Sequence, residues 1–156
     1  MIDELYSGKI LKLAADMPRA GRLAAPHASS EKVAKLCGSK IVVDVVLDEA
    51  GRVGDFAQDV RACALGQAAA AVLGARVIGA ELAEIEIARD ALRAMLKSNG
   101  SPPAGRFAEL AVLEAVKDYP ARHASTMLAF EAAAEAVRAA MGGLARTSPA
   151  GAARLA

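Results

Sequence analysis

Residues 36–52 of this chain read LCGSKIVVDVVLDEAGR, and this stretch decides the fold. Apolar side chains stand at every second position over 41–47, which predicts a strand because successive side chains of a strand point to opposite faces. The polar residues that follow include Gly51, whose freedom to adopt a positive φ favours a hairpin turn. Residues 53–60 read as the returning strand, so the stretch predicts an antiparallel β-hairpin.

Helical periodicity dominates the chain outside this hairpin. Helices are predicted over 5–17, over about 65–77, over 81–97 and over 107–116, and a last helix begins at Ser125 or Thr126 and ends near residue 140. Residues 19–36 are predicted to be irregular or weakly extended. Segregated strands and helices indicate the α+β class, a small antiparallel sheet of about three strands with helices packed on one face.

The composition fits a single domain. The chain has 156 residues, of which 54% are hydrophobic and 3% aromatic, so its core is aliphatic. We expect one domain over 1–141 and a disordered tail over 142–156, where Gly, Ala, Ser, Pro and Arg predominate. The net charge of +1 argues against binding to nucleic acid or to an anionic membrane. No apolar stretch reaches the ~20 residues of a membrane span and no secretory signal is visible, so the expected compartment is the cytoplasm.

The two cysteines of the chain flank the predicted hairpin. Cys37 stands just before its first strand, and Cys63 stands between its second strand and the Ala-rich helix. Pairing of the strands through the turn at Gly51 would bring both thiols to the same end of the hairpin. Two neighbouring thiols are candidate ligands for a soft metal ion. The alternative is that they only fill space, because free cysteines are among the most buried residues.

Three segments resemble the cysteine segments of one family, the iron–sulfur cluster assembly scaffolds IscU, SufU and the N-terminal domain of NifU. Residues 36–45, LCGSKIVVDV, are similar to a Cys-Gly-Asp motif that leads into a β-hairpin. Residues 62–71, ACALGQAAAA, are similar to a Gly-Cys followed by a helix of small residues. Residues 122–130, RHASTMLAF, are similar to a segment in which a cysteine opens the last helix and a Leu-Ala follows. The order and spacing of these segments extend the similarity over residues 3–140.

The resemblance implies a NifU/IscU-like fold and a protein that receives sulfur from a cysteine desulfurase and passes a cluster to recipient apo-proteins. The implied cofactor is an iron–sulfur cluster of the [2Fe–2S] type or iron, with zinc as the alternative. The family's site uses three cysteines and an aspartate, and Cys37 and Cys63 match two of these cysteines. Ser39 stands at the position of the aspartate and Ser125 at the third cysteine, while His123 lies one place before the position of a His or Lys.

The last three residues are weaker candidates for metal ligands. A serine hydroxyl stays protonated near neutral pH, so it is a poor substitute for a thiolate. Ser125 is expected to be the N-cap of the last helix, because serine is strongly favoured there. Ser39 also fits a strand edge that it would cap or solvate, and His123 also fits an exposed surface position.

Three functions are compatible with this set of candidate ligands. The first is a scaffold that binds iron or an iron–sulfur cluster through Cys37 and Cys63. Two thiolates are too few to hold a cluster, so a second chain, glutathione or a partner must complete the ligands, and we expect the cluster to be shared between the chains of a homodimer. The second is a degenerate family member that acts as a zinc-binding or partner-binding module without cluster assembly. The third, an enzyme with Cys63 as nucleophile, needs a base and a residue that orients the base. His123 is the candidate base and no orienting residue can be assigned, so we expect no enzyme.

Overall fold

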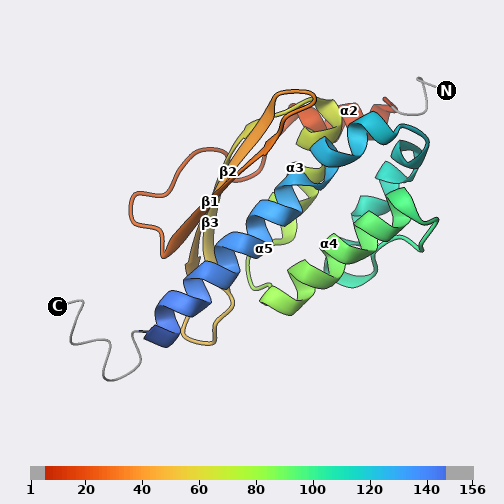
Figure 1. Cartoon of the computed structure of the whole chain (residues 1–156). Coiled ribbons are helices and arrows are strands. Elements are labelled where there is room, and N and C mark those ends of the chain that lie inside the picture. Colours follow the sequence, from red (N-terminus) through yellow and green to blue (C-terminus); the bar gives the residue numbers. More distant parts are fainter. Residues whose placement is uncertain (1–5, 147–156) are drawn as a thin grey trace.

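The computed structural model describes residues 6–146 and has one antiparallel sheet covered by helices (Figure 1). In chain order the elements are α2 (Gly8–Ala15), β1 (Ala28–Ala34), β2 (Ser39–Leu47), β3 (Val53–Arg61), α3 (Ala64–Arg76), α4 (Leu82–Lys97), the 3-10 helices η1 (Gly105–Asp118) and η2 (Pro120–Arg122), and α5 (His123–Arg146). The strands lie in the order β1-β2-β3, and each neighbouring pair is antiparallel. The predicted α+β class and three-stranded sheet are therefore confirmed.

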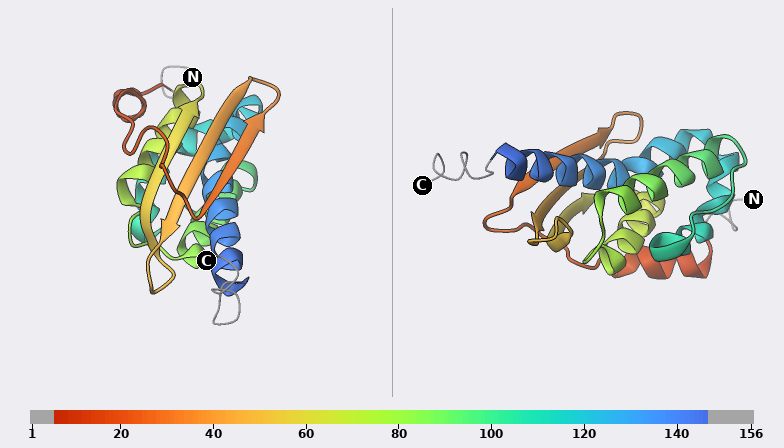
Figure 2. Two further views of the ribbon diagram at one scale, coloured as in Figure 1. Left: turned by 90° about the vertical axis from the view of Figure 1, so that its left-hand side faces the viewer. Right: turned by 90° about the horizontal axis from the view of Figure 1, so that it is seen from below.

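Helices cover one face of this sheet. α5 packs along β1 and β2, α3 packs beside α5, and α4 lies against the outer side of α5 (Figure 2). The chain between α2 and β1 crosses the opposite face, where the guanidinium of Arg22 and the backbone N–H of Leu23 donate hydrogen bonds to the carboxylate of Asp44. The helices thus lie as predicted, and the second face is covered by a segment without regular structure.

β1 lies within the stretch that was expected to be irregular or weakly extended. Its sequence, ASSEKVA, is rich in residues of low strand propensity. β2 nevertheless pairs with all seven of its residues. Ser30 is buried on the helix side of the strand, where it donates a hydrogen bond to Glu135 of α5. The tertiary partners β2 and α5 therefore stabilise a strand that the local sequence favours only weakly.

The helix predicted over 107–116 lies in η1, which is a 3-10 helix with a kink at Phe107 rather than an α-helix. Its buried side chains are Phe107, Leu110, Leu113 and Val116. They stand three residues apart, which is the period of a 3-10 helix. In an α-helix each step of three residues would turn the stripe by about 60° away from the core. The core-facing stripe therefore explains the tighter helix.

α5 is longer than predicted at both ends. It begins at His123, directly after η2, and it continues through Gly142 to Arg146. The disordered tail predicted from residue 142 is therefore wrong for 142–146, and its remaining residues, 147–156, lie outside the described residues. Although α5 has 24 residues, no helix within the described part of the chain is long and apolar enough to cross a membrane.

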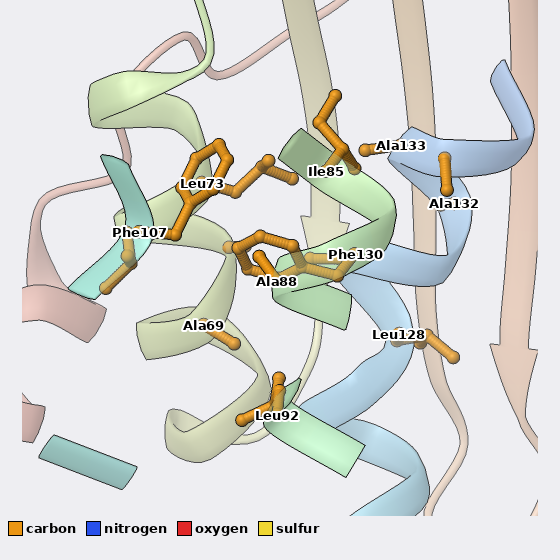
Figure 3. Close-up of a cluster of buried hydrophobic side chains, with 14 of the residues drawn as sticks. Ala69, Leu73, Ile85, Ala88, Leu92, Phe107, Leu128, Phe130, Ala132 and Ala133 are labelled. Carbon is orange, nitrogen blue, oxygen red and sulfur yellow. The ribbon is translucent and has the colours of Figure 1, made fainter. Parts of the chain in front are cut away.

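The centre of the core is built from small residues on α3 and α5 and from two aromatic rings. Phe107 of η1 and Phe130 of α5 contact each other edge to face, with ring centroids 5.1 Å apart (Figure 3). Ala69 of α3 and Ala133 of α5 are fully buried near them. Alanine side chains let helix backbones approach closely, so the position of α5 against α3 is tightly determined.

Candidate functional site

Three elements bring side chains to one end of the sheet. The turn between β1 and β2 carries Cys37, and β2 begins at Ser39. The strand register places Lys40 of β2 opposite Arg61 of β3, so β3 ends beside this turn. Cys63 follows as the N-cap of α3. Ser125 comes from the first turn of α5, which begins at the same end of the molecule (Figure 1).

The four side chains form one hydrogen-bonded chain. Cys37 Sγ lies 3.1 Å from Ser39 Oγ, and Ser39 Oγ lies 3.4 Å from Ser125 Oγ. Ser125 Oγ lies in turn 3.0 Å from Cys63 Sγ. The expectation that the hairpin brings both thiols to the same end is therefore confirmed, and two serine hydroxyls connect them.

The thiols of this chain of hydrogen bonds reach solvent, whereas the hydroxyls do not. Cys37 is exposed and Cys63 is partly exposed. Ser39 and Ser125 keep only 3% and 0% of their surface exposed. The hydrogen bond from the Ser39 hydroxyl lowers the pKa of the Cys37 thiol; desolvation opposes this shift, and the Ser39 N–H and the Ser125 hydroxyl support it. Because the thiolate is the nucleophile and the metal ligand, Cys37 is the more reactive candidate that this geometry defines.

The backbone of the β1–β2 turn holds Cys37 in place. Gly38 has a φ of 75°, a conformation that residues with a Cβ rarely adopt. Its N–H donates a hydrogen bond of 2.9 Å to the carbonyl oxygen of Ala34, which closes the turn. The Cys-Gly sequence therefore has a local structural reason, because the glycine lets the thiol stand at the tip of the turn.

Gly66 is a residue of the site that sequence reasoning missed. A Cβ on this residue of α3 would lie 2.9 Å from Ser125 Oγ and 3.0 Å from the Ser125 carbonyl oxygen. Such contacts are too short for a real side chain, so only glycine allows α5 to approach α3 here. The sequence offers a weak signal, a glycine inside an otherwise Ala-rich helix.

The roles expected for Ser125 and Ser39 outside a metal site are wrong. Ser125 is not the N-cap of α5, because η2 leads directly into this helix and moves its beginning to His123. Ser39 does not lie at a solvent-facing edge, because β2 is the central strand and Ser39 is buried. Both hydroxyls point instead toward each other and toward the two thiols.

His123 is buried, with 5% of its surface exposed, so the expected surface position is wrong. Its Nε2 atom is hydrogen-bonded to the carbonyl oxygen of Val116 at 2.9 Å and lies 3.3 Å from that of Lys117. The imidazole therefore connects α5 to η1. No hydrogen bond among the described residues joins it to Cys63, as the base of a cysteine-nucleophile enzyme would require.

Asp44 is a second residue whose role the sequence pattern does not disclose. It is a fully buried carboxylate in the middle of β2, bound by Arg22, by Ser29 and by the N–H of Leu23. Burial by itself raises the pKa of this carboxyl, but the hydrogen bonds from Arg22, Ser29 and the Leu23 N–H hold the pKa below its ordinary value. The ionised side chain therefore anchors the segment that covers the outer face of the sheet.

The donor set of the site is small. Within residues 6–146, no group of three or more Cys, His, Asp or Glu side chains comes together as a metal site. One chain therefore offers two sulfur atoms and two hydroxyls at the end of the hairpin. Tetrahedral zinc sites and iron–sulfur clusters take four protein ligands, so a single chain does not complete either one.

The fold and this site define a small α+β domain with two thiols at one end of its sheet, and comparison with known proteins identifies its family. Residues 5–126 match the model of the NifU-like N-terminal domain. A crystal structure of a nitrogen-fixing NifU-like protein (N-terminal) from Brucella abortus is similar to this chain, with a TM-score of 0.87 and 48% sequence identity over 90% of this chain and 97% of that one. The chain belongs to the NifU-like N-terminal domain family, which confirms the family that its sequence resembles.

A more distant structure has the same fold. It is described as an iron–sulfur cluster assembly scaffold protein for the SUF system, FiSufU, from Fervidobacterium islandicum. The TM-score is 0.78 at 19% identity, over 86% of this chain and 98% of that one. A comparison with curated proteins gave no match.

Proposed function

We propose that this protein is a scaffold for iron–sulfur cluster assembly, with Cys37 and Cys63 as its ligands to the cluster. The observation that carries the proposal is the hydrogen-bonded chain of two thiols and two hydroxyls, which comes from three separate elements. Membership of the NifU-like family supports it, and so does the shared fold with a protein described as such a scaffold. An exposed thiol at the tip of a turn is accessible to a donor protein, as a scaffold requires.

Cys37 is the residue that meets the sulfur donor in this proposal. The donor is a cysteine desulfurase that carries sulfur as a persulfide. The thiolate of Cys37 attacks the outer sulfur, a new S–S bond forms on Cys37, and the donor's own thiolate leaves as the old S–S bond breaks. Exposure of Cys37 and its lowered pKa both favour this attack.

The cluster itself is shared between two chains. A [2Fe–2S] cluster takes four protein ligands, and each chain supplies the thiolates of Cys37 and Cys63. Ser39 and Ser125 carry hydroxyls instead of thiols and are buried and hydrogen-bonded, so they do not replace the missing sulfur ligands. A homodimer therefore gives the required four sulfur ligands, and the assembled cluster passes to recipient apo-proteins in the cytoplasm.

Anaerobic reconstitution tests this proposal. Iron and sulfide are added to the purified protein without any low-molecular-weight thiol, and the product is sized and analysed for iron, sulfide and protein. We expect about one [2Fe–2S] cluster for two chains, with the cluster lost in Cys37→Ala and Cys63→Ala variants. A full cluster carried by a strict monomer would refute the shared site, and variants that keep the cluster content of the wild type would refute the ligand assignment.

A second candidate function is a zinc-binding or partner-binding module without cluster assembly. The observation that favours it is apolar surface beside the thiols, since Leu36 and Val33 are 79% and 49% exposed. Such side chains are typical of a surface that contacts another protein. Metal analysis of protein purified without added metal separates the two functions. Bound zinc without iron favours a zinc-binding module, whereas no bound metal, in the wild type and in Cys37→Ala alike, favours a partner-binding module.

A further inference from the structure

The donor set at the end of the hairpin suits a metal ion of low coordination number. Each chain supplies two sulfur atoms that reach solvent. Ser39 and Ser125 beside them are buried and hydrogen-bonded. In the part of the chain that the structure describes, no third Cys, His, Asp or Glu side chain joins the two thiols. A metal ion bound by one chain alone must therefore be satisfied by two soft ligands.

The cuprous ion meets this condition, whereas zinc does not. Soft thiolate ligands select Cu(I), a monovalent d¹⁰ ion that low coordination numbers satisfy. Zinc in proteins is almost always four-coordinate and tetrahedral in structural sites. With two thiolates from one chain, zinc would leave two positions to water. The number and type of donors thus favour Cu(I) in the monomer.

We propose that Cys37 and Cys63 of a single chain bind one Cu(I) ion as a two-coordinate bis-thiolate site. The inference rests on the part of the proposed function that makes these two thiols metal ligands, and it adds a second cargo that a monomer can hold. Both thiols lose their protons to solvent as two Cu–S bonds form, so the complex carries one negative charge. The metal stays in the cuprous state, and no electron is transferred.

The two serines make this binding possible without leaving buried polar groups unpaired. Each sulfur gives up its hydrogen bond to a serine hydroxyl when it turns to the metal, at Ser39 for Cys37 and at Ser125 for Cys63. The two hydroxyls already lie 3.4 Å apart, so they remain hydrogen-bonded to each other. A buried hydroxyl that lost its only partner would destabilise the protein. The paired serines remove this cost, and the exposed Cys37 gives the ion a route of entry.

Titration with cuprous ion tests the proposal. Tetrakis(acetonitrile)copper(I) is added to the reduced full-length protein without oxygen, in competition with bathocuproine disulfonate, and the complex is sized. We expect one copper per chain in a monomer, two sulfur neighbours per copper by X-ray absorption, and no displacement by a tenfold excess of zinc. Cys37→Ala and Cys63→Ala should each lose the copper. Lys35→Ala, an exposed change in the same turn, should retain it.

Several results would overturn this inference. The first is that the competitor removes copper from the wild type as readily as from both cysteine variants. The second is that copper binds only between two chains, and the third is that zinc displaces the copper. Circular dichroism of the cysteine variants shows whether they are folded, and alkylation of both thiols by iodoacetamide in the wild type provides a second way to block the site. Failure of cluster reconstitution with copper still bound would refute the proposed function alone. Cluster reconstitution without copper binding would refute the cuprous site alone.

Discussion

Replacement of Gly66 by alanine tests whether α3 and α5 meet as closely as the site requires. The new Cβ would lie 2.9 Å from Ala62 Cβ, 2.9 Å from Ser125 Oγ and 3.0 Å from the Ser125 carbonyl oxygen. Two of these three atoms belong to Ser125, so α5 or its first turn must shift. Overpacking of this kind costs about 1–3 kcal/mol. Alanine in a helix gains about 1 kcal/mol over glycine, so the net loss in the free energy of unfolding is about 0–2 kcal/mol.

Urea and thermal unfolding measure this loss. For a chain of this length the melting temperature should fall by up to about 8 °C, since each kcal/mol corresponds to about 2–4 °C. Movement of Ser125 also breaks its hydrogen bond to Cys63, so the rate at which Cys63 reacts with a thiol reagent should change in a Cys37→Ala background.

Gly142→Ala is the matched control for this experiment. Gly142 also lies in a helix, α5, but a Cβ there would have no atom within 4 Å. The same change should therefore raise the free energy of unfolding by about 0.5–1 kcal/mol. If Gly66→Ala proved as stable as Gly142→Ala, with unchanged thiol reactivity, the close approach of α3 to Ser125 would be refuted.

Three further predictions concern other contacts. Asp44→Asn should destabilise the protein by about 1–3 kcal/mol near neutral pH because it removes a buried, hydrogen-bonded charge. The folded-state pKa of Asp44 is lowered, so its contribution to the free energy of unfolding is present above the ordinary pKa of 3.8 and is lost as the pH falls below that value. Urea unfolding of the variant at a series of pH values should therefore lack this part of the acid dependence. Arg106→Lys should lower the free energy of unfolding by about 1–2 kcal/mol in the same assay. Its guanidinium binds Glu84 and the carbonyl oxygens at and just after the end of α3 in a geometry that an ammonium group does not reproduce. Ser125→Cys should add a third sulfur ligand and raise zinc affinity roughly a hundredfold in chelator competition. A four-ligand zinc site yields about 10–16 kcal/mol in total, and the added sulfur supplies the share of one ligand. An unchanged affinity would contradict the position of Ser125 between the thiols.

The hairpin and its consequences could be predicted because they depend on local patterns. Alternation over 41–47 and the turn at Gly51 specify two paired strands, and the pairing of strands fixes which residues lie at each end. The proximity of Cys37 and Cys63 follows from that register alone. β1 could not be predicted with the same clarity, because its residues favour a strand only when β2 and α5 are present.

The amino-acid sequence by itself determined the α+β class, the hairpin, the two thiols at its end and the family. These features depend on periodicity and motif spacing, which are local patterns of the sequence. The tertiary structure decided what lies between the thiols. Ser39 and Ser125 are 86 residues apart in sequence, and their hydroxyls meet only because α5 packs onto the sheet beside α3. That packing depends on Gly66, which allows the helices to touch where any side chain would hold them apart. Contacts between distant elements depend on how well whole surfaces fit, and no local pattern records that fit.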